Sequence, residues 1–165
     1  MAKQPAFVIA LTSEECCLFV HSRKPWLRNS SPVHSISIMQ GLHLTADLHH
    51  CRCDPALLVD AAALLQLCVK AVDVAGLQAV NQLVHAFPAV DGEPSGVTAT
   101  VLLAESHLCI HTWPELQAVT LDVYVCNFGG DHSAKARRLM DALLAVFKPE
   151  STDRHELHRG TLHKH

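Results

Sequence analysis

The sequence predicts an α+β two-layer sandwich, in which a mainly antiparallel sheet is covered on one face by two helices. Segments with strand-like alternation of apolar and polar residues outnumber segments with helical periodicity. Most predicted strands are separated by short turns, which favours antiparallel pairing because parallel strands need long crossovers. The chain has 165 residues, of which 49% are hydrophobic, so we expect one domain with a substantial core.

The first half of the predicted domain contains a strand, a helix and a second strand. Residues 41–49 alternate apolar and polar side chains, as a half-buried strand does. A helix is predicted to begin at Asp54, with Pro55 at its first position, because aspartate caps helices and proline fits their first turn. Apolar residues then recur at helical spacing until Gly76, which is suited to end the helix. Residues 77–87 are predicted as the second strand.

The second half is predicted to contain three strands, a helix and a short final strand. Residues 88–95 include two prolines and a glycine, which is typical of a loop. Runs rich in Val, Leu and Thr predict strands at 96–104, 108–112 and 119–126. Apolar residues at helical spacing predict a helix at 133–147, and a last strand is expected at 154–158.

The composition restricts the setting in which the protein works. Residues 1–38 lack sustained periodicity and are predicted to be a disordered extension, and residues 161–165 are predicted to be a solvated tail. The formal net charge of -3 argues against a nucleic-acid partner. We find no apolar run long enough for a membrane span and no signal-peptide pattern, so a cytoplasmic protein is expected. The seven cysteines are therefore expected to be reduced thiols.

Residues 104–115 gather reactive side chains between two predicted strands. This segment reads Ala-Glu-Ser-His-Leu-Cys-Ile-His-Thr-Trp-Pro-Glu and contains the Ser106 hydroxyl, two imidazoles, a thiol and two carboxylates. Three kinds of chemistry are compatible with it. His107, Cys109 and His111 alternate and would share a strand face, but ligands spaced roughly 6–7 Å apart suit a tetrahedral metal poorly. A Cys–His nucleophile pair and a Ser–His pair remain open, although Ser106 lacks the G-x-S-x-G context of hydrolases.

The same segment resembles the self-cleavage motif of prokaryotic S-adenosylmethionine decarboxylases, which follows the pattern E-S-H-x-x-I-H-T-W-P-E. Further similarities are the Gly-Leu-His-Leu start of the first strand, the His-Ala-Phe sequence at 85–87 and the Gly-Val-Thr sequence at 96–98. Asp122 and Cys126 also fall at the spacing of the family. The resemblance covers residues 39–160, which we therefore interpret as one pyruvoyl-dependent decarboxylase domain.

The resemblance implies a proenzyme that cleaves itself between Glu105 and Ser106. Ser106 would become a covalent pyruvoyl cofactor that forms a Schiff base with the substrate amine. His111 would donate and accept protons during processing, with support from the Thr98 hydroxyl. Cys126 would return a proton after loss of carbon dioxide, and no metal site is expected. Because Ser106 and His111 are five residues apart, a kink or turn after Ser106 is expected to bring them together.

The resemblance also implies a substrate and a partner. The substrate would be S-adenosylmethionine, whose decarboxylated product donates aminopropyl groups in spermidine synthesis. Phe87 would stack on the adenine or face the sulfonium, and Glu115 would accept from the ribose hydroxyls. The family builds its active site where two protomers meet, so a homodimer of cleaved protomers is expected.

Several positions depart from the family pattern and leave two alternatives open. Leu42 and Ala86 replace basic residues, the loop at 88–95 is longer, and residues 116–118 and 127–133 differ from the usual sequence. A pyruvoyl-dependent decarboxylase of arginine or ornithine is one alternative. An uncleaved homologue without enzymatic activity is the other.

Overall fold

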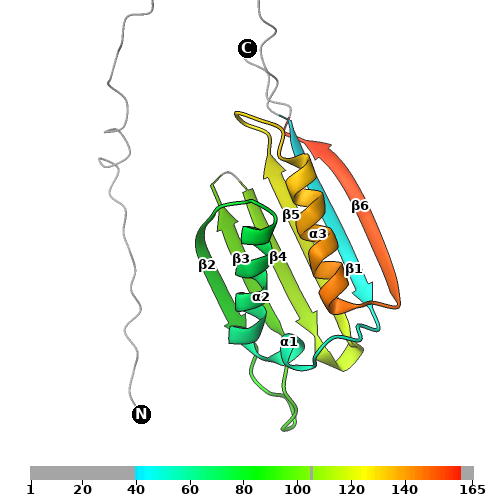
Figure 1. The fold of residues 1–165 in the computed structure, drawn as a ribbon. Coiled ribbons are helices and arrows are strands. Elements are labelled where there is room, and N and C mark those ends of the chain that lie inside the picture. Colours follow the sequence, from blue (N-terminus) through cyan, green and yellow to red (C-terminus); the bar gives the residue numbers. More distant parts are fainter. Residues whose placement is uncertain (1–39, 105, 161–165) are drawn as a thin grey trace, which may run out of the picture. The chain divides into compact units, whose positions relative to one another are not determined.

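The computed structural model describes residues 40–104 and 106–160, and these form a six-stranded sheet covered by helices (Figure 1). The strand order is β2-β3-β4-β5-β1-β6, and every neighbouring pair is antiparallel. The strands are β1 (Gly41–His49), β2 (Ala79–Ala86), β3 (Val97–Leu103), β4 (Ser106–Trp113), β5 (Ala118–Cys126) and β6 (Ser151–Arg159). The predicted extension at 1–38, Glu105 and the tail at 161–165 lie outside the described residues.

Helices cover one face of this sheet. They are α1 (Ala56–Val59), α2 (Ala61–Val74) and α3 (Ser133–Phe147), and a single 3-10 turn η2 (Pro114–Leu116) joins β4 to β5. Figure 1 shows α2 in front of β3 and β4, and α3 in front of β5 and β1. The predicted α+β two-layer sandwich is confirmed. None of the described helices is long and apolar enough to cross a membrane.

The core follows from the two-residue repeat of the strands. In β1, β3, β4 and β5, alternate side chains are buried against the helices, and those between them face the open side of the sheet. Phe147, Leu139, Met140 and Leu143 of α3 are fully buried against these strands. We call the side of the sheet away from the helices the open face. It carries most of the polar side chains of the motif on β4.

The structure corrects several element boundaries, and the last strand spans Ser151–Arg159 rather than residues 154–158. The first predicted helix is broken at Asp60, which has an extended backbone and caps α2 by accepting from the amides of Ala62 and Ala63. Asp54 caps only the single turn of α1, by accepting from Ala56. The strand β4 begins at Ser106 rather than at residue 108, so the motif is part of the strand itself.

Candidate active site

Ser106 lies at the tight connection between β3 and β4. It is the first residue of β4 and is paired with Leu103, the last residue of β3, so that only two residues join the strands. The Ser106 Oγ atom accepts a hydrogen bond from the backbone N–H of Cys126 at 3.1 Å. The peptide bond predicted to be cut therefore belongs to a hairpin turn, and the hydroxyl beside it is held by the residue predicted to act as proton donor.

A cavity of about 280 Å³ lies beside Ser106 and Cys126. Its wall includes the backbone that follows α2 at Gly76 and two side chains near the start of α3, His132 and Lys135. Neither residue was predicted from the sequence: His132 lies in the segment at 127–133 that departs from the family pattern, and Lys135 lies in the first turn of α3. The cavity shows that the surroundings of Ser106 include groups from three separate parts of the chain.

His111 and Thr98 lie near the opposite end of the same hairpin. They are direct cross-strand partners, and the Thr98 Oγ1 atom lies 2.8 Å from His111 Nδ1. The strand β4 pairs continuously with β3 and β5, and no kink follows Ser106, so that expectation was wrong. Five residues of extended strand span about 17 Å. Within a single chain, Thr98 therefore lies beside His111, and Cys126 lies beside Ser106. The two pairs are far apart from each other.

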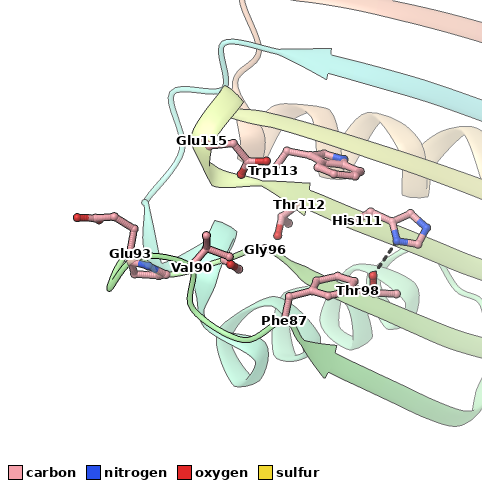
Figure 2. Close-up of a pocket in the computed structure, with 11 residues that line it drawn as sticks. Phe87, Val90, Glu93, Gly96, Thr98, His111, Thr112, Trp113 and Glu115 are labelled. Atoms are coloured by element: carbon pink, nitrogen blue, oxygen red, sulfur yellow. Dashed lines mark hydrogen bonds between the residues drawn. The ribbon is translucent and has the colours of Figure 1, made fainter.

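Beside Thr98 and His111 is the pocket drawn in Figure 2, which has a volume of about 570 Å³. Phe87 and Glu115, the predicted substrate contacts, both line it. The Phe87 ring packs edge-on against His85, with ring centroids 5.1 Å apart. The loop at 88–95 contributes a small hairpin to the wall, closed by the pairing of Val90 with Glu93. The structure thus gathers the four residues predicted for processing support and substrate binding around one cavity.

Two motif residues near this pocket have structural roles. Thr112 is 3% exposed, and its hydroxyl donates to the Leu58 carbonyl at 2.7 Å and accepts from the Val97 amide at 2.8 Å. This hydroxyl connects α1, β3 and β4. A side chain at Gly96 would collide with the Thr112 carbonyl, which explains the glycine of the Gly-Val-Thr sequence.

A polar cluster occupies the open face next to Ser106. The Nε2 atoms of His43 and His107 lie 3.2 Å and 3.1 Å from the same oxygen of Asp122, and the Arg159 guanidinium lies 3.3 Å from His43 Nδ1. Because a guanidinium can only donate, His43 Nδ1 accepts and its Nε2–H donates to Asp122. If His43 bound a metal through Nε2, its proton would sit on Nδ1. That proton would then face the Arg159 guanidinium, which cannot accept a hydrogen bond. The arrangement therefore favours a hydrogen-bond network over metal ligation.

The described cysteines, which are Cys51, Cys53, Cys68, Cys109 and Cys126, are all free thiols. Burial raises the pKa of Cys51 to about 11 and that of Cys68 to about 12, so these two stay protonated at neutral pH. Cys109 and Cys126 belong to the two ends of the predicted site instead. Burial also raises the pKa of Cys53, which lies in the loop after β1 and outside the predicted site. Cys109 and Cys126 are therefore the candidate thiols for chemistry among the described residues.

Comparisons with known proteins agree with this geometry. The model of the S-adenosylmethionine decarboxylase family matches residues 42–160. A protein of Picrophilus torridus named S-adenosylmethionine decarboxylase proenzyme is 35% identical over 126 residues, which are 76% of this chain and 88% of the relative. The chain belongs to the S-adenosylmethionine decarboxylase family. A proenzyme of the same name from Persephonella marina is 38% identical over 125 residues, which are 76% of this chain and 86% of that protein.

The fold of this S-adenosylmethionine decarboxylase family member is shared by a solved structure. The crystal structure of the adenosylmethionine decarboxylase from Aquifex aeolicus aligns with a TM-score of 0.64 and 32% identity. The alignment covers 78% of this chain and 98% of that chain. The described domain therefore corresponds to nearly the whole of that enzyme, and the resemblance read from the motif is confirmed.

Proposed function

We propose that this protein is a self-processing S-adenosylmethionine decarboxylase. The observation that carries the proposal is the placement of Ser106 at the start of β4, with its hydroxyl held by the Cys126 amide. Family membership supports the activity, since the matched relatives are named S-adenosylmethionine decarboxylase proenzymes. The product would be decarboxylated S-adenosylmethionine, an aminopropyl donor for spermidine synthesis.

Processing begins at the Ser106 hydroxyl. Its oxygen attacks the carbonyl carbon of residue 105, the carbon–nitrogen bond breaks, and the amide becomes an ester with a free amino group on residue 106. Elimination then releases the carboxyl end of the first fragment, and hydrolysis of the remaining enamine releases ammonia. The N–H of Cys126 donates to the attacking oxygen and so holds the hydroxyl in place before the attack.

The surroundings of Ser106 fit the pyruvoyl group that the family implies. Such a group supplies a carbonyl that withdraws electrons when the substrate loses its carboxylate. The cavity beside Ser106 gives room for the substrate amine, and Cys126 lines the same cavity. The Cys126 thiol carries a proton that it can return to the substrate carbon.

A homodimer completes the site in this proposal. Ser106 and His111 are kept apart in one protomer, so the Thr98–His111 pair must reach a Ser106 of another copy. The open face offers a surface for that copy, because it carries apolar side chains that are 45% to 73% exposed. These are Leu83, Leu102, Trp113 and Leu157. Two open faces packed in opposite orientation would place each Ser106 near the partner's processing pair.

The pocket at the far end of the hairpin suits an adenosyl group. Phe87 is half exposed and offers a ring face to a purine, and the Glu115 carboxylate lies at the rim, where it can accept from two ribose hydroxyls (Figure 2). The Thr98 and His111 side chains line the same pocket on the open face. A substrate bound here would extend from this pocket toward the partner's Ser106.

The direct test is carbon dioxide release from carboxyl-labelled S-adenosylmethionine by the purified full-length chain. Arginine and ornithine, labelled in the same way, serve as comparison substrates. Release from S-adenosylmethionine together with cleavage into two chains is the expected result. Release from an amino acid alone would contradict the proposed substrate, and an uncleaved chain would contradict the proposed chemistry.

A further inference from the structure

A chain of four polar side chains crosses β3 and β4 on the open face. Thr98 and His111 are cross-strand partners, and so are Thr100 and Cys109. The Thr98 Oγ1 atom lies 2.8 Å from His111 Nδ1, and Cys109 Sγ lies 3.6 Å from His111 Nε2. Thr100 Oγ1 then lies 3.4 Å from Cys109 Sγ. Both ring nitrogens of His111 are thus engaged, one by a hydroxyl and one by a thiol.

The chemistry required of His111 fixes the direction of these contacts. For the Thr98 hydroxyl to donate to His111, Nδ1 must carry a lone pair, so the single proton of the neutral ring must sit on Nε2. The atom facing Nε2 must then accept. Among the described residues, Cys109 Sγ is the hydrogen-bond partner of that nitrogen, and its own S–H can donate onward to Thr100. Each side chain then donates a hydrogen bond to the next one, from Thr98 through His111 and Cys109 to Thr100.

We propose that Cys109 is a positioning residue for processing, which selects the His111 tautomer with its proton on Nε2 and so directs the Nδ1 lone pair at Thr98. This inference rests on the proposed function, because it assigns a role within the self-cleavage reaction. The arrangement has the logic of a catalytic triad, in which a third group orients the base that activates a hydroxyl. Here the third group is a thiol.

The family motif does not account for Cys109. The family motif E-S-H-x-x-I-H leaves the residue at Cys109 open, so the family's known chemistry does not require a thiol there. Cys109 is half-buried, unlike the core thiol of Cys68, and its side chain lies on the same strand face as His107 and His111. The contact between the Cys109 thiol and His111 can therefore be tested separately from the residues of the family motif.

The first measurement reads the tautomer without any turnover. The full-length chain with Ser106→Ala, which is unable to cleave, is labelled with nitrogen-15 in its histidine rings, and a His111→Gln version assigns the signals. We expect His111 to carry its proton on Nε2. Adding Cys109→Ala should produce a mixture of tautomers, whereas Cys109→Ser should keep the original one because a hydroxyl can also accept.

The second measurement is the rate of self-cleavage with Ser106 intact. Loss of one hydrogen bond of ordinary strength predicts that Cys109→Ala slows processing about fivefold. Cys109→Ser should restore most of the rate. Cys53→Ala is the matched control, because that half-buried thiol lies in the loop after β1, and it should cleave at the native rate. The KM for S-adenosylmethionine should stay unchanged in the fully processed variants.

The outcomes separate this inference from the proposed function. A native tautomer and native cleavage rate in Cys109→Ala would overturn the role of Cys109 while leaving the decarboxylase proposal intact. A proton on Nδ1 in the Ser106→Ala chain would also overturn it. If the unsubstituted chain fails to cleave, the proposed function falls, and the ring-nitrogen spectra still decide the tautomer. Should Cys109→Ala not fold, Thr100→Val removes the outer partner of the thiol and should weaken the tautomer preference.

Discussion

The two ends of the β3–β4 hairpin differ in what they can do. The turn end holds Ser106 and Cys126 beside a cavity of about 280 Å³, and it contains the bond to be broken. The other end holds Thr98 and His111 beside a pocket of about 570 Å³ that is lined by aromatic and apolar groups. One end has the nucleophile without its histidine, and the other has the histidine without a nucleophile.

This division shows how a motif that is short in sequence can be distributed in space. Extended strand separates residues by about 3.3 Å each, so neighbours in the motif reach different ends of the sheet. A small domain can still assemble a complete site if two copies meet with their hairpins in opposite directions. The division therefore favours a shared site, and each substitution below tests one end against the other.

The largest effect is expected at the turn end. Ser106→Ala removes the attacking oxygen, so the chain should remain a single species of 18.0 kDa and release no carbon dioxide. Intact mass and a denaturing gel measure the first outcome, and the labelled-substrate assay measures the second. Ser151→Ala, at the exposed start of β6, is the control and should cleave normally. A cleaved Ser106→Ala chain would show that another residue is the nucleophile.

His111→Ala tests the opposite end and should slow self-cleavage by about 10²–10⁴, the usual contribution of a positioned acid or base. The His111→Ala chain can be unfolded and refolded with an equal amount of the Ser106→Ala chain. Random pairing should make half of the dimers mixed, and each mixed dimer should have one intact site, with Ser106 from one variant and His111 from the other. Cleavage should then recover to about a quarter of the native extent, because a symmetric dimer has two equivalent sites. Failure to recover, with mixed dimers verified by mass, would place each site within one protomer.

Cys126→Ala should separate processing from decarboxylation. The backbone N–H that holds Ser106 remains in this variant, so cleavage should continue. Without the thiol, we expect turnover of the cleaved enzyme to fall by about 10² or more. Cys51→Ala changes a buried thiol outside the site and serves as the control. Native turnover in Cys126→Ala would assign the proton to a different donor, and the nearby His132 would be the next residue to change.

A smaller effect is expected in the pocket at the far end. Glu115→Gln keeps the shape but removes the charge that would hold the ribose hydroxyls, so KM should rise about tenfold with little change in kcat. Glu150→Gln is the matched control, because Glu150 is an exposed carboxylate between α3 and β6 and does not line this pocket. Equal KM values for the two variants would remove Glu115 from the proposed substrate site.

The smallest effect on catalysis is expected from Thr112→Val, which acts on the fold. The substitution leaves the Leu58 carbonyl and the Val97 amide without their hydroxyl partner. We expect unfolding free energy to fall by about 1–3 kcal/mol, measured by denaturant titration of the Ser106→Ala chain to avoid cleavage. The Ser106→Ala chain without the second substitution provides the reference. Unchanged stability would mean that water replaces the hydroxyl at this junction.

Much of this fold could be predicted because its strands alternate cleanly and its helices have continuous apolar stripes. The bounds of β1 and α3 agree with the pattern at every residue. The break at Asp60 was missed, because the apolar spacing continues across it and only the backbone at that residue changes. Local periodicity carries no information about such a break.

The candidate site was predictable in its residues but not in its arrangement. The motif identified Ser106 and His111, yet the expected kink between them is absent, because pairing with β3 and β5 on both sides keeps β4 straight. The contacts of Cys109, and the cavity wall formed by His132 and Lys135, depend on cross-strand register and on loop packing. Neither could be read from the order of residues alone.

The position of β1 in the sheet has a consequence for the mature enzyme. Cleavage between residues 105 and 106 would leave β1, β2 and β3 on one polypeptide and β4, β5 and β6 on the other. In the sheet, β1 lies between β5 and β6, so the two polypeptides interleave. The pieces could not separate without breaking the sheet. Refolding the mature protein would then require a second-order encounter, whereas the uncut precursor folds as one chain, and denaturation of the processed enzyme would be hard to reverse in dilute solution.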